Sequence, residues 1–412
     1  MLLQTTTLLA VSVAAAATAT TTTTTTTTPF SRLMLDSLKT RLQGIASSGA
    51  PSSTLESAVL ALSIEALLDQ YPASGPGPDN DDLFLGAVLD LAAGAFPDAD
   101  RAADRPMDRF ALATAIDRAI SSGRVPVSPA ARNASRAIAA SLPLQTRNPD
   151  GGLWYYHAYP QWSYLDGLFA VLPYLAALPG RNESDMELQL ALVQKHCDRP
   201  AGRPLLVHGY DWSRTASWAD AKNGASPHVW GRSMGWLLVG VIETWEMLSC
   251  AGHHSRPFCH RLQRLTLRVA DSLVSLADLE SGAWRQLTIL SEHFGNYLES
   301  SSTALYIFAL LKALRIRMLP PGPPYYRHVA ERAYNYTLHS FVNYDPKNSS
   351  IIGYGRTVSV CSLNSSASYE YYISQPLMPN SLLGESAFIL ASLEIERLEP
   401  EPDGLTIPFS NK

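Results

Sequence analysis

The chain has 412 residues, a formal net charge of -5 at pH 7 and a hydrophobic content of 46%. This length allows one large domain or two ordinary ones, and the composition is typical of a globular protein with a sizeable core. The negative charge argues against nucleic acid as a partner, because nucleic-acid binders are usually basic. After the first apolar run no uninterrupted stretch of about 20 apolar residues follows, so no membrane partner is expected.

Residues 1–19 have the features of a secretory signal peptide. Within them, residues 8–19 form a short apolar run that ends in small residues, although no Lys or Arg precedes it. Residues 20–30 are threonine-rich and cannot bury apolar surface, so we expect this tract to be unstructured. Secretion is the expectation, and an unstructured tail on a cytosolic protein is the alternative. Five Asn-x-Ser/Thr sequons agree with a secreted glycoprotein: Asn133, Asn182, Asn335, Asn348 and Asn364.

Residues 31–405 are predicted to form one helical domain, followed by a tail at residues 406–412. Apolar residues recur at three- and four-residue steps in roughly ten to twelve segments. Two of these segments, residues 164–178 and 230–248, are apolar on most faces and are predicted to be inner helices. Alternating runs typical of strands are scarce, and residues 351–360 are the best candidate for a short strand. The further predicted helices are residues 53–68, 110–120, 188–193, 262–276, 303–316, 329–342 and 385–398.

Inner helices that are apolar on nearly every side need a second layer of helices around them. An all-α barrel of six helical hairpins, the (α/α)6 barrel, satisfies this requirement within a single domain. An α-solenoid is the alternative, but solenoids usually show a repeat of roughly 30–45 residues, and the chain shows none. The sequence therefore favours the barrel.

Two acidic segments contain candidate functional residues. Residues 79–86 (DNDDLFLG) place Asp81 and Asp82 before a predicted helix, where acids most often cap the helix, although a second acid of a cleft would come from here. Glu299, before a helix rich in small residues, is interpreted as structural.

Residues 154–166 (WYYHAYPQWSYLD) place seven aromatic rings, Tyr155 and Tyr164 among them, before Asp166. Asp166 could simply be an acid in the first turn of a helix, where the helix dipole favours it. Alternatively, the aromatic wall desolvates Asp166 and raises its pKa, which suits a general acid that works near neutral pH. The residues alone leave both interpretations open.

Residues 208–236 concentrate histidine, tryptophan and arginine among small and turn-forming residues. Aromatic faces pack on sugar rings and Arg grips carboxylates, so this segment favours a cleft for acidic carbohydrate. Trp230, Arg232 and Trp236 start a long helix, and a guanidinium buried there requires a carboxylate from the protein or from a uronate. His208 either lines the cleft or caps a turn.

The four cysteines are too few for a disulfide scaffold. Cys250 and Cys259 bracket a short loop and could close a local bridge. The loop also holds His253 and His254, but it lacks the usual zinc spacings, so a disulfide or free thiols are favoured over a metal.

In their order along the chain, these blocks resemble the unsaturated rhamnogalacturonyl hydrolases, glycoside hydrolase family 105, of the secreted, fungal type. The resemblance runs from about residue 81 to residue 394. It rests on DDLFLG, GGLWYYHAYPQWSYLDGLFAVLPYLA, HGYDWSR, WADAKNGASPHVWGRSMGW, NYLESSSTALYIFAL and SYEYYISQPLMPNSLLGESAFILASLEIE. It implies an (α/α)6 barrel and neither a metal nor an organic cofactor.

The family that the chain resembles acts on oligosaccharides left by polysaccharide lyases, which end in a C4=C5 unsaturated uronic acid. The resemblance implies that Asp166 protonates this vinyl ether at C4 and then helps water to add at C5. It places the second active-site aspartate on Asp81, with Asp82 as the rival. It also implies that His208, Trp230, Arg232 and Trp236 line the sugar and the water.

Departures from the family pattern concern the sugar contacts. Tyr155 and Tyr156 stand where the family often has His and Lys, and Tyr164 replaces a common tryptophan. The function that the resemblance as a whole implies is hydrolysis of unsaturated rhamnogalacturonan fragments during pectin degradation. The alternatives are an unsaturated glucuronyl hydrolase and an inactive sugar-binding barrel. The sequence does not determine the oligomeric state.

Overall fold

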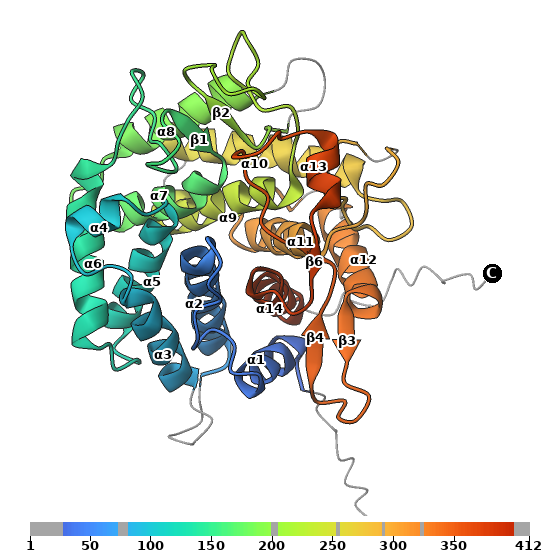
Figure 1. Ribbon diagram of the computed structural model, residues 1–412. Helices are drawn as coiled ribbons and strands as arrows, with labels where there is room; N and C mark the ends of the chain where they lie inside the picture. The colour runs from blue at the N-terminus through green and yellow to red at the C-terminus, as the bar shows by residue number, and fades with distance from the viewer. Residues whose placement is uncertain are drawn as a thin grey trace, which may run out of the picture.

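Six long helices form a closed ring at the centre of the molecule. The computed structural model describes residues 28–72, 81–198, 205–252, 256–290, 293–321 and 325–398. Within this part each ring helix packs against the next, and the last packs against the first (Figure 1). In ring order they are α2 (Ser53–Gln70), α5 (Asp108–Ser122), α7 (Asp166–Ala177), α9 (Gly231–Met247), α11 (Ser300–Arg315) and α14 (Leu382–Glu396).

A second layer of helices lies outside this ring. The α10 helix illustrates its sequence logic, because its buried residues include Phe258, Leu262, Leu265 and Val269, which are three or four positions apart. By contrast, every residue of α7 from Asp166 to Ala176 is buried. The outer helices are α1 (Phe30–Thr40), α3 (Asp81–Ala93), α6 (Pro129–Ser141), α8 (Glu183–Cys197), α10 (Pro257–Leu276) and α12 (Tyr325–Ser340).

This arrangement confirms the predicted all-α barrel of six hairpins. Shorter helices lie in the connections: α4 (Ala99–Ala103), α13 (Tyr369–Ser374) and two 3-10 turns at Leu142–Leu144 and Cys250–Gly252. Among the described residues, no helix is long and apolar enough to cross a membrane.

The inner helices run in the same direction, because an outer helix returns the chain after each of them. The first turns of α2, α5, α7, α9 and α14 line one pocket, and the last turns of α2, α5, α9, α11 and α14 line a cavity. We call these two ends of the barrel the N-terminal end and the C-terminal end.

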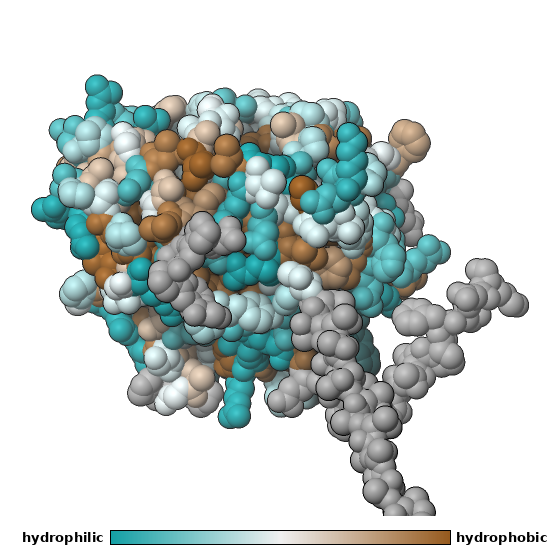
Figure 2. Space-filling model, turned by 90° about the horizontal axis from the view of Figure 1, so that it is seen from below, coloured by the Kyte–Doolittle hydropathy of each residue, from teal (hydrophilic) through white to brown (hydrophobic). Residues whose placement is uncertain are grey.

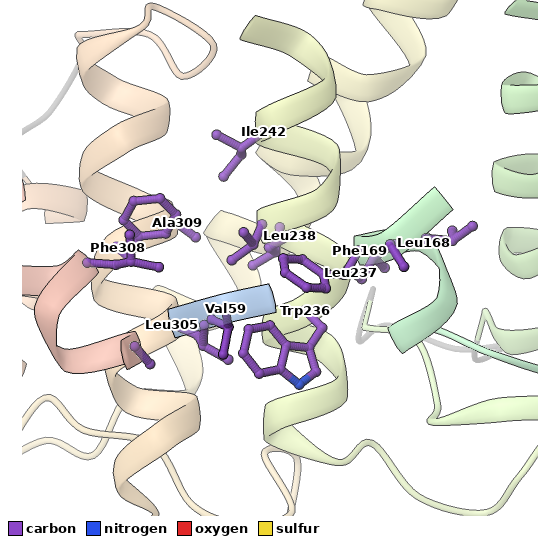
Figure 3. Packing of buried hydrophobic residues seen from close by; sticks show 14 of the residues in the cluster. Val59, Leu168, Phe169, Trp236, Leu237, Leu238, Ile242, Leu305, Phe308 and Ala309 are labelled. Carbon is purple, nitrogen blue, oxygen red and sulfur yellow. The ribbon is translucent and has the colours of Figure 1, made fainter. Parts of the chain in front are cut away.

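Close helix packing joins α7, α9 and α11 in the core. A Cβ atom at Gly240 of α9 would lie 2.6 Å from both the carbonyl oxygen of Leu168 and the Cα of Phe169, so only glycine allows this approach to α7. Figure 3 shows Trp236 of α9 between Phe169 of α7 and Leu305 of α11. The ring centroids of Trp236 and Phe169 are 4.9 Å apart. This packing fixes the helix that carries Arg232.

The described residues also form three short antiparallel strand pairs: β1 (Trp162–Tyr164) with β2 (Gly209–Asp211), β3 (Val342–Tyr344) with β4 (Ile352–Tyr354), and β5 (Thr357–Val358) with β6 (Leu377–Met378). The strands β4 and β5 confirm the expectation for residues 351–360. The predicted inner helix at residues 164–178 begins later, at Asp166, because Tyr164 pairs with Gly209 in β1 and β2.

Cys250 and Cys259 form a disulfide that closes the loop after α9, with their Cα atoms 5.6 Å apart. This confirms the local bridge as the better of the sequence alternatives. Cys197 and Cys361 are free and buried. Within the described ranges, no group of three or more His, Cys, Asp and Glu residues could hold a metal ion. His253 and His254 lie outside these ranges, as do the predicted signal peptide and C-terminal tail.

Candidate active site

A narrow pocket at the N-terminal end of the barrel collects most of the predicted site residues. It contains two carboxylates, Asp108 and Asp166, which come from the first turns of α5 and α7. Seven of the eight predicted residues line it, and Asp81 is the exception. The lining comprises Ser52, Leu55, Asp108, Tyr155, Tyr156, Tyr164, Asp166, His208, Trp230, Arg232, Trp236, Val360, Cys361 and Leu383.

Asp166 is positioned by the junction between β1 and α7. The backbone N–H of Leu165 donates to the carbonyl of His208 at 3.0 Å, which extends the β1–β2 ladder up to the helix start. Ser233 donates its hydroxyl proton to Oδ2 of Asp166, and Nε2 of His208 lies 3.5 Å from the same oxygen. The structure therefore brings together two residues that are far apart in the sequence, as the resemblance implied.

His208 is 1% exposed and is held on several sides. Its Nδ1 lies 2.7 Å from the hydroxyl of Tyr372 in α13. Its ring contacts Tyr164 edge-on at 5.3 Å and Trp230 at 4.8 Å between centroids. A turn-capping role does not account for these side-chain contacts, so His208 belongs to the pocket wall.

Asp108 is a functional candidate that the sequence analysis missed. It is 2% exposed, and Tyr155 donates a hydrogen bond to its Oδ1 at 2.6 Å. Burial above all, with the nearby charge of Asp166, raises the pKa of Asp108 to about 7 against the lowering effect of the Tyr155 hydrogen bond. A buried acid at the start of a predicted helix was the available signal. It was not distinctive, because acids favour the first turn of any helix.

Asp81 is not part of this pocket, which corrects the prediction that it supplies the second carboxylate. It begins the outer helix α3, where it forms ion pairs with Arg32 and, at 3.0 Å, with Lys39 of α1. Its neighbour Asp82 is likewise absent from the pocket lining. Figure 2 views the molecule from the side of α1 and α3, and hydrophilic and hydrophobic residues are mixed on that surface. Asp81 therefore joins two outer helices, and Asp108 takes its place as the second candidate acid.

Arg232 lines the pocket without a carboxylate from the described part of the chain as its partner, so of the two predicted partners only the uronate stays a prediction. Its Nη1 donates to the carbonyl of Val358 at 2.7 Å and its Nη2 to that of Ser359 at 2.6 Å. Two main-chain carbonyls and, at 3.3 Å, the hydroxyl of Ser301 are thus its partners among the described residues, and no carboxylate is among them. Arg232 brings positive charge to the pocket and anchors the segment that leads to Val360 and Cys361.

The aromatic candidates form the remaining walls. Trp230 stacks under the Arg232 guanidinium at 4.8 Å and donates its indole N–H to Gln286 at 3.1 Å. Tyr155 and Tyr164 pack with ring centroids 4.7 Å apart. Gln286 was not singled out in the sequence, because an isolated glutamine carries no pattern.

Glu299 confirms its interpretation as a structural residue. It is fully buried at the N-cap of α11, where it accepts hydrogen bonds from the backbone N–H groups of Ser302 and Val358. Together with Arg232 it fixes residues 358–359 against the barrel.

A much larger cavity of about 440 Å³ lies at the C-terminal end, but its chemistry differs. Its charged groups form ion pairs across neighbouring helices, such as Lys312 with Glu243 and Arg315 with Glu394. In the described part of the chain, Asp108 and Asp166 form no ion pair with Lys or Arg. We therefore assign the candidate site by the unpaired carboxylates, not by volume.

The helix arrangement contributes partial positive charge to the pocket. The partial positive charge of an α-helix lies at its N-terminus, and the inner helices all direct that terminus to this end. Such a site favours an anionic ligand. The geometry thus provides two carboxylates for proton transfer beside a region that attracts negative charge.

Comparison with known families agrees with this geometry. The family model of Glycosyl Hydrolase Family 88 matches residues 124–399. Asp166 and His208 lie inside the match, whereas Asp108 precedes it. The 24.9 kDa protein in the picA locus of Rhizobium radiobacter is 32% identical over 115 residues. That match covers 28% of this chain, and the chain spans about half the length of the curated relative.

Two solved structures share the fold. A glycoside hydrolase of family 105 from C. acetobutylicum has a TM-score of 0.78 at 24% identity, and the match covers 90% of this chain and 100% of that one. The unsaturated glucuronyl hydrolase from Bacillus sp. GL1, described as responsible for the degradation of glycosaminoglycan, has a TM-score of 0.58 at 14% identity. This second match covers 85% of this chain and 88% of that chain.

Proposed function

The chain belongs to glycosyl hydrolase family 88, and from its pocket chemistry we propose that it removes a terminal 4,5-unsaturated uronic acid from lyase-generated oligosaccharides. The observation that carries this proposal is the placement of Asp108, Asp166 and His208 in one pocket at the N-terminal ends of the inner helices. Such a site combines acid–base groups with a potential that favours the uronate carboxylate.

Asp166 acts as the general acid and base. In its protonated form it transfers its proton to C4 of the vinyl ether, which leaves positive charge shared between C5 and the ring oxygen. The resulting carboxylate then accepts a proton from the water that attacks C5. The product is a hemiketal, which opens and releases the next sugar. Ser233 and His208 hold the Asp166 carboxyl group in place throughout.

Asp108 supports the protonated form of the pair. Two neighbouring carboxyl groups in a buried site do not both ionise readily, so the pair retains a proton to higher pH than an isolated acid. The pKa of Asp108, raised to about 7 mainly by burial, is consistent with a carboxyl group that still holds a proton near neutral pH.

The substrate proposed first is an unsaturated rhamnogalacturonan fragment. Its support is the match to a family 105 structure, which is closer than the match to the glucuronyl hydrolase. The pocket volume is about 30 Å³, enough for a water molecule but not for a sugar ring. Binding therefore requires side chains of the wall to move outward.

Secretion remains part of the proposal. The disulfide between Cys250 and Cys259 supports it, because disulfides persist mainly in oxidising compartments. Recovery of the protein in the medium, beginning after residue 19, would test the proposed signal peptide.

The test follows the ultraviolet absorbance of the unsaturated uronate, which disappears when C4=C5 is hydrated. Products of a rhamnogalacturonan lyase, a pectate lyase and a glycosaminoglycan lyase serve as parallel substrates. We expect the fastest loss with the first. Loss of absorbance with none of the three would refute the proposed activity, and a preference for the last would favour glucuronyl hydrolysis.

Replacement of Asp166 by Asn tests the assignment of the acid. We expect kcat to fall by roughly 10²–10⁴-fold, the usual contribution of an acid–base residue. Asp150→Asn is the matched control, because Asp150 is exposed and pairs with Lys195 on the surface. An Asp166→Asn variant as active as this control would transfer the role of acid to Asp108.

A further inference from the structure

Tyr372 is a buried residue that the proposed mechanism does not yet use. It lies in α13, between the pocket residues Cys361 and Leu383 along the chain, and is fully buried. Gln286 donates to its backbone carbonyl at 3.1 Å, and the same Gln286 accepts the indole N–H of Trp230. The helix that carries Tyr372 is therefore tied to the pocket wall.

The hydroxyl of Tyr372 lies 2.7 Å from Nδ1 of His208, and this is its one hydrogen bond in the described structure. A phenol hydroxyl that finds no acceptor in a buried site loses its hydration without compensation, which is unfavourable. Burial raises the pKa of Tyr372 well above its usual value, so the hydroxyl keeps its proton. Nδ1 of His208 is thus the acceptor, and Tyr372 is the donor.

This direction of the hydrogen bond determines the tautomer of His208. A neutral imidazole has one protonated nitrogen, so an Nδ1 that accepts a hydrogen bond carries no hydrogen and leaves it on Nε2. Nε2 faces Oδ2 of Asp166 at 3.5 Å. An Nε2–H group donates toward the carboxyl oxygen and cannot accept a proton from it.

The opposite tautomer would compete with the reaction. An unprotonated Nε2 beside Asp166 would accept the proton that the mechanism sends to C4. It would also leave the buried Tyr372 hydroxyl without an acceptor. We propose that Tyr372 is a positioning residue, which holds neutral His208 in its Nε2–H form so that Asp166 keeps its proton for the substrate. The mechanistic part of this inference rests on the proposed function.

The experiment reads the tautomer directly by ¹⁵N NMR of histidine-labelled protein at neutral pH. Spectra of the wild type and of His208→Gln identify the His208 signals. We expect wild-type His208 to have an unprotonated Nδ1 and a protonated Nε2, and the Tyr372→Phe variant to show partial protonation of Nδ1. A wild-type His208 protonated on Nδ1 alone would overturn the inference, whatever its activity.

The kinetic arm uses a disaccharide of unsaturated galacturonic acid and rhamnose, made with a rhamnogalacturonan lyase. We expect Tyr372→Phe to lower kcat by about tenfold, the value of one buried hydrogen bond, and to leave KM within about twofold. Tyr371→Phe is the matched control on the same helix, because its hydroxyl bonds to Ser362 and Ser365 of the neighbouring loop and not to His208. Equal kcat values in the two variants would contradict the inference. An inactive wild type would contradict the proposed function instead, while the NMR result would still decide the tautomer.

Discussion

The two ends of the barrel are formed by the same inner helices but differ in how their buried charged groups are paired. At the N-terminal end, Asp108 and Asp166 are buried without a Lys or Arg ion pair in the described structure. At the C-terminal end, Lys312 is 7% exposed and lies between Glu243 and Glu246. Helix N-termini are partially positive and C-termini partially negative, so each end favours the charge found in its centre.

The same difference distinguishes acids that can serve in catalysis from acids whose ion pairs contribute to stability. A carboxylate left without a cation keeps a raised pKa and can exchange protons, as Asp108 shows. At the other end, the pKa of Glu243 falls to about 2 because Lys312 and Arg118 outweigh its burial. An acid with so low a pKa does not carry protons at neutral pH.

The largest expected effect is at the N-terminal end, in Asp108→Asn. Because the pocket then loses an acid whose raised pKa lets it hold a proton near neutral pH, we expect kcat/KM to fall by roughly 10²-fold or more in the absorbance assay. Asp81→Asn is the control, since Asp81 pairs only with outer-helix cations and should leave the folded enzyme active. Equal losses in both variants would restore Asp81 as the second acid.

The same variant should alter the pH dependence of stability. A carboxyl whose pKa is raised from about 4 in the unfolded chain to about 7 in the folded one binds an extra proton when folded. Its contribution to the free energy of unfolding therefore decreases as pH rises through that window. Denaturation of Asp108→Asn should show a gain over the wild type that grows between pH 4 and pH 7. A constant difference would mean that Asp108 titrates normally.

At the C-terminal end, Lys312→Met should reduce the free energy of unfolding by about 3–5 kcal/mol, because it leaves buried carboxylates without their cation. We expect kcat of the remaining folded enzyme to be unchanged. Lys195→Met is the comparison, because the Lys195 side chain is 62% exposed and its pair with Asp150 should contribute less than about 1 kcal/mol. Similar decreases in the free energy of unfolding of the two variants, measured by chemical denaturation, would show that the buried ion pairs contribute no more than the exposed one.

Glu65→Gln should have the smallest effect and the opposite sign. Burial raises the pKa of Glu65 to about 8, although Arg118 lies 3.9 Å away. The folded protein therefore holds an extra proton between about pH 4.5 and pH 8, and the wild type loses stability across this range. The gain in the free energy of unfolding of Glu65→Gln over the wild type should grow up to pH 8 and then stay constant. It should stay smaller than the loss in Lys312→Met, because the cavity is large enough for water to hydrate the Glu65 carboxylate. Glu187→Gln, on the exposed face of α8, should show no such trend in thermal denaturation.

Several features of the fold and site followed from sequence patterns alone. Apolar residues on nearly every face identified α7 and α9 as inner helices, because a helix surrounded by others has no side left for water. The clustered aromatic residues before Asp166, and the segment from His208 to Trp236, located most of the pocket. These signals are local, so a single sequence can display them.

The tertiary structure alone decided which distant side chains meet. Asp81 and Asp108 both begin a helix, and nothing local separates them, yet α3 lies in the outer layer and α5 in the inner ring. The partner of Arg232 and the pairing of His208 with Tyr372 also depend on loops that return from the end of the chain. Sequence patterns report how each helix is buried, whereas contacts between helices depend on the closed ring. For that reason the first candidate acid came from the sequence and the second only from the structure.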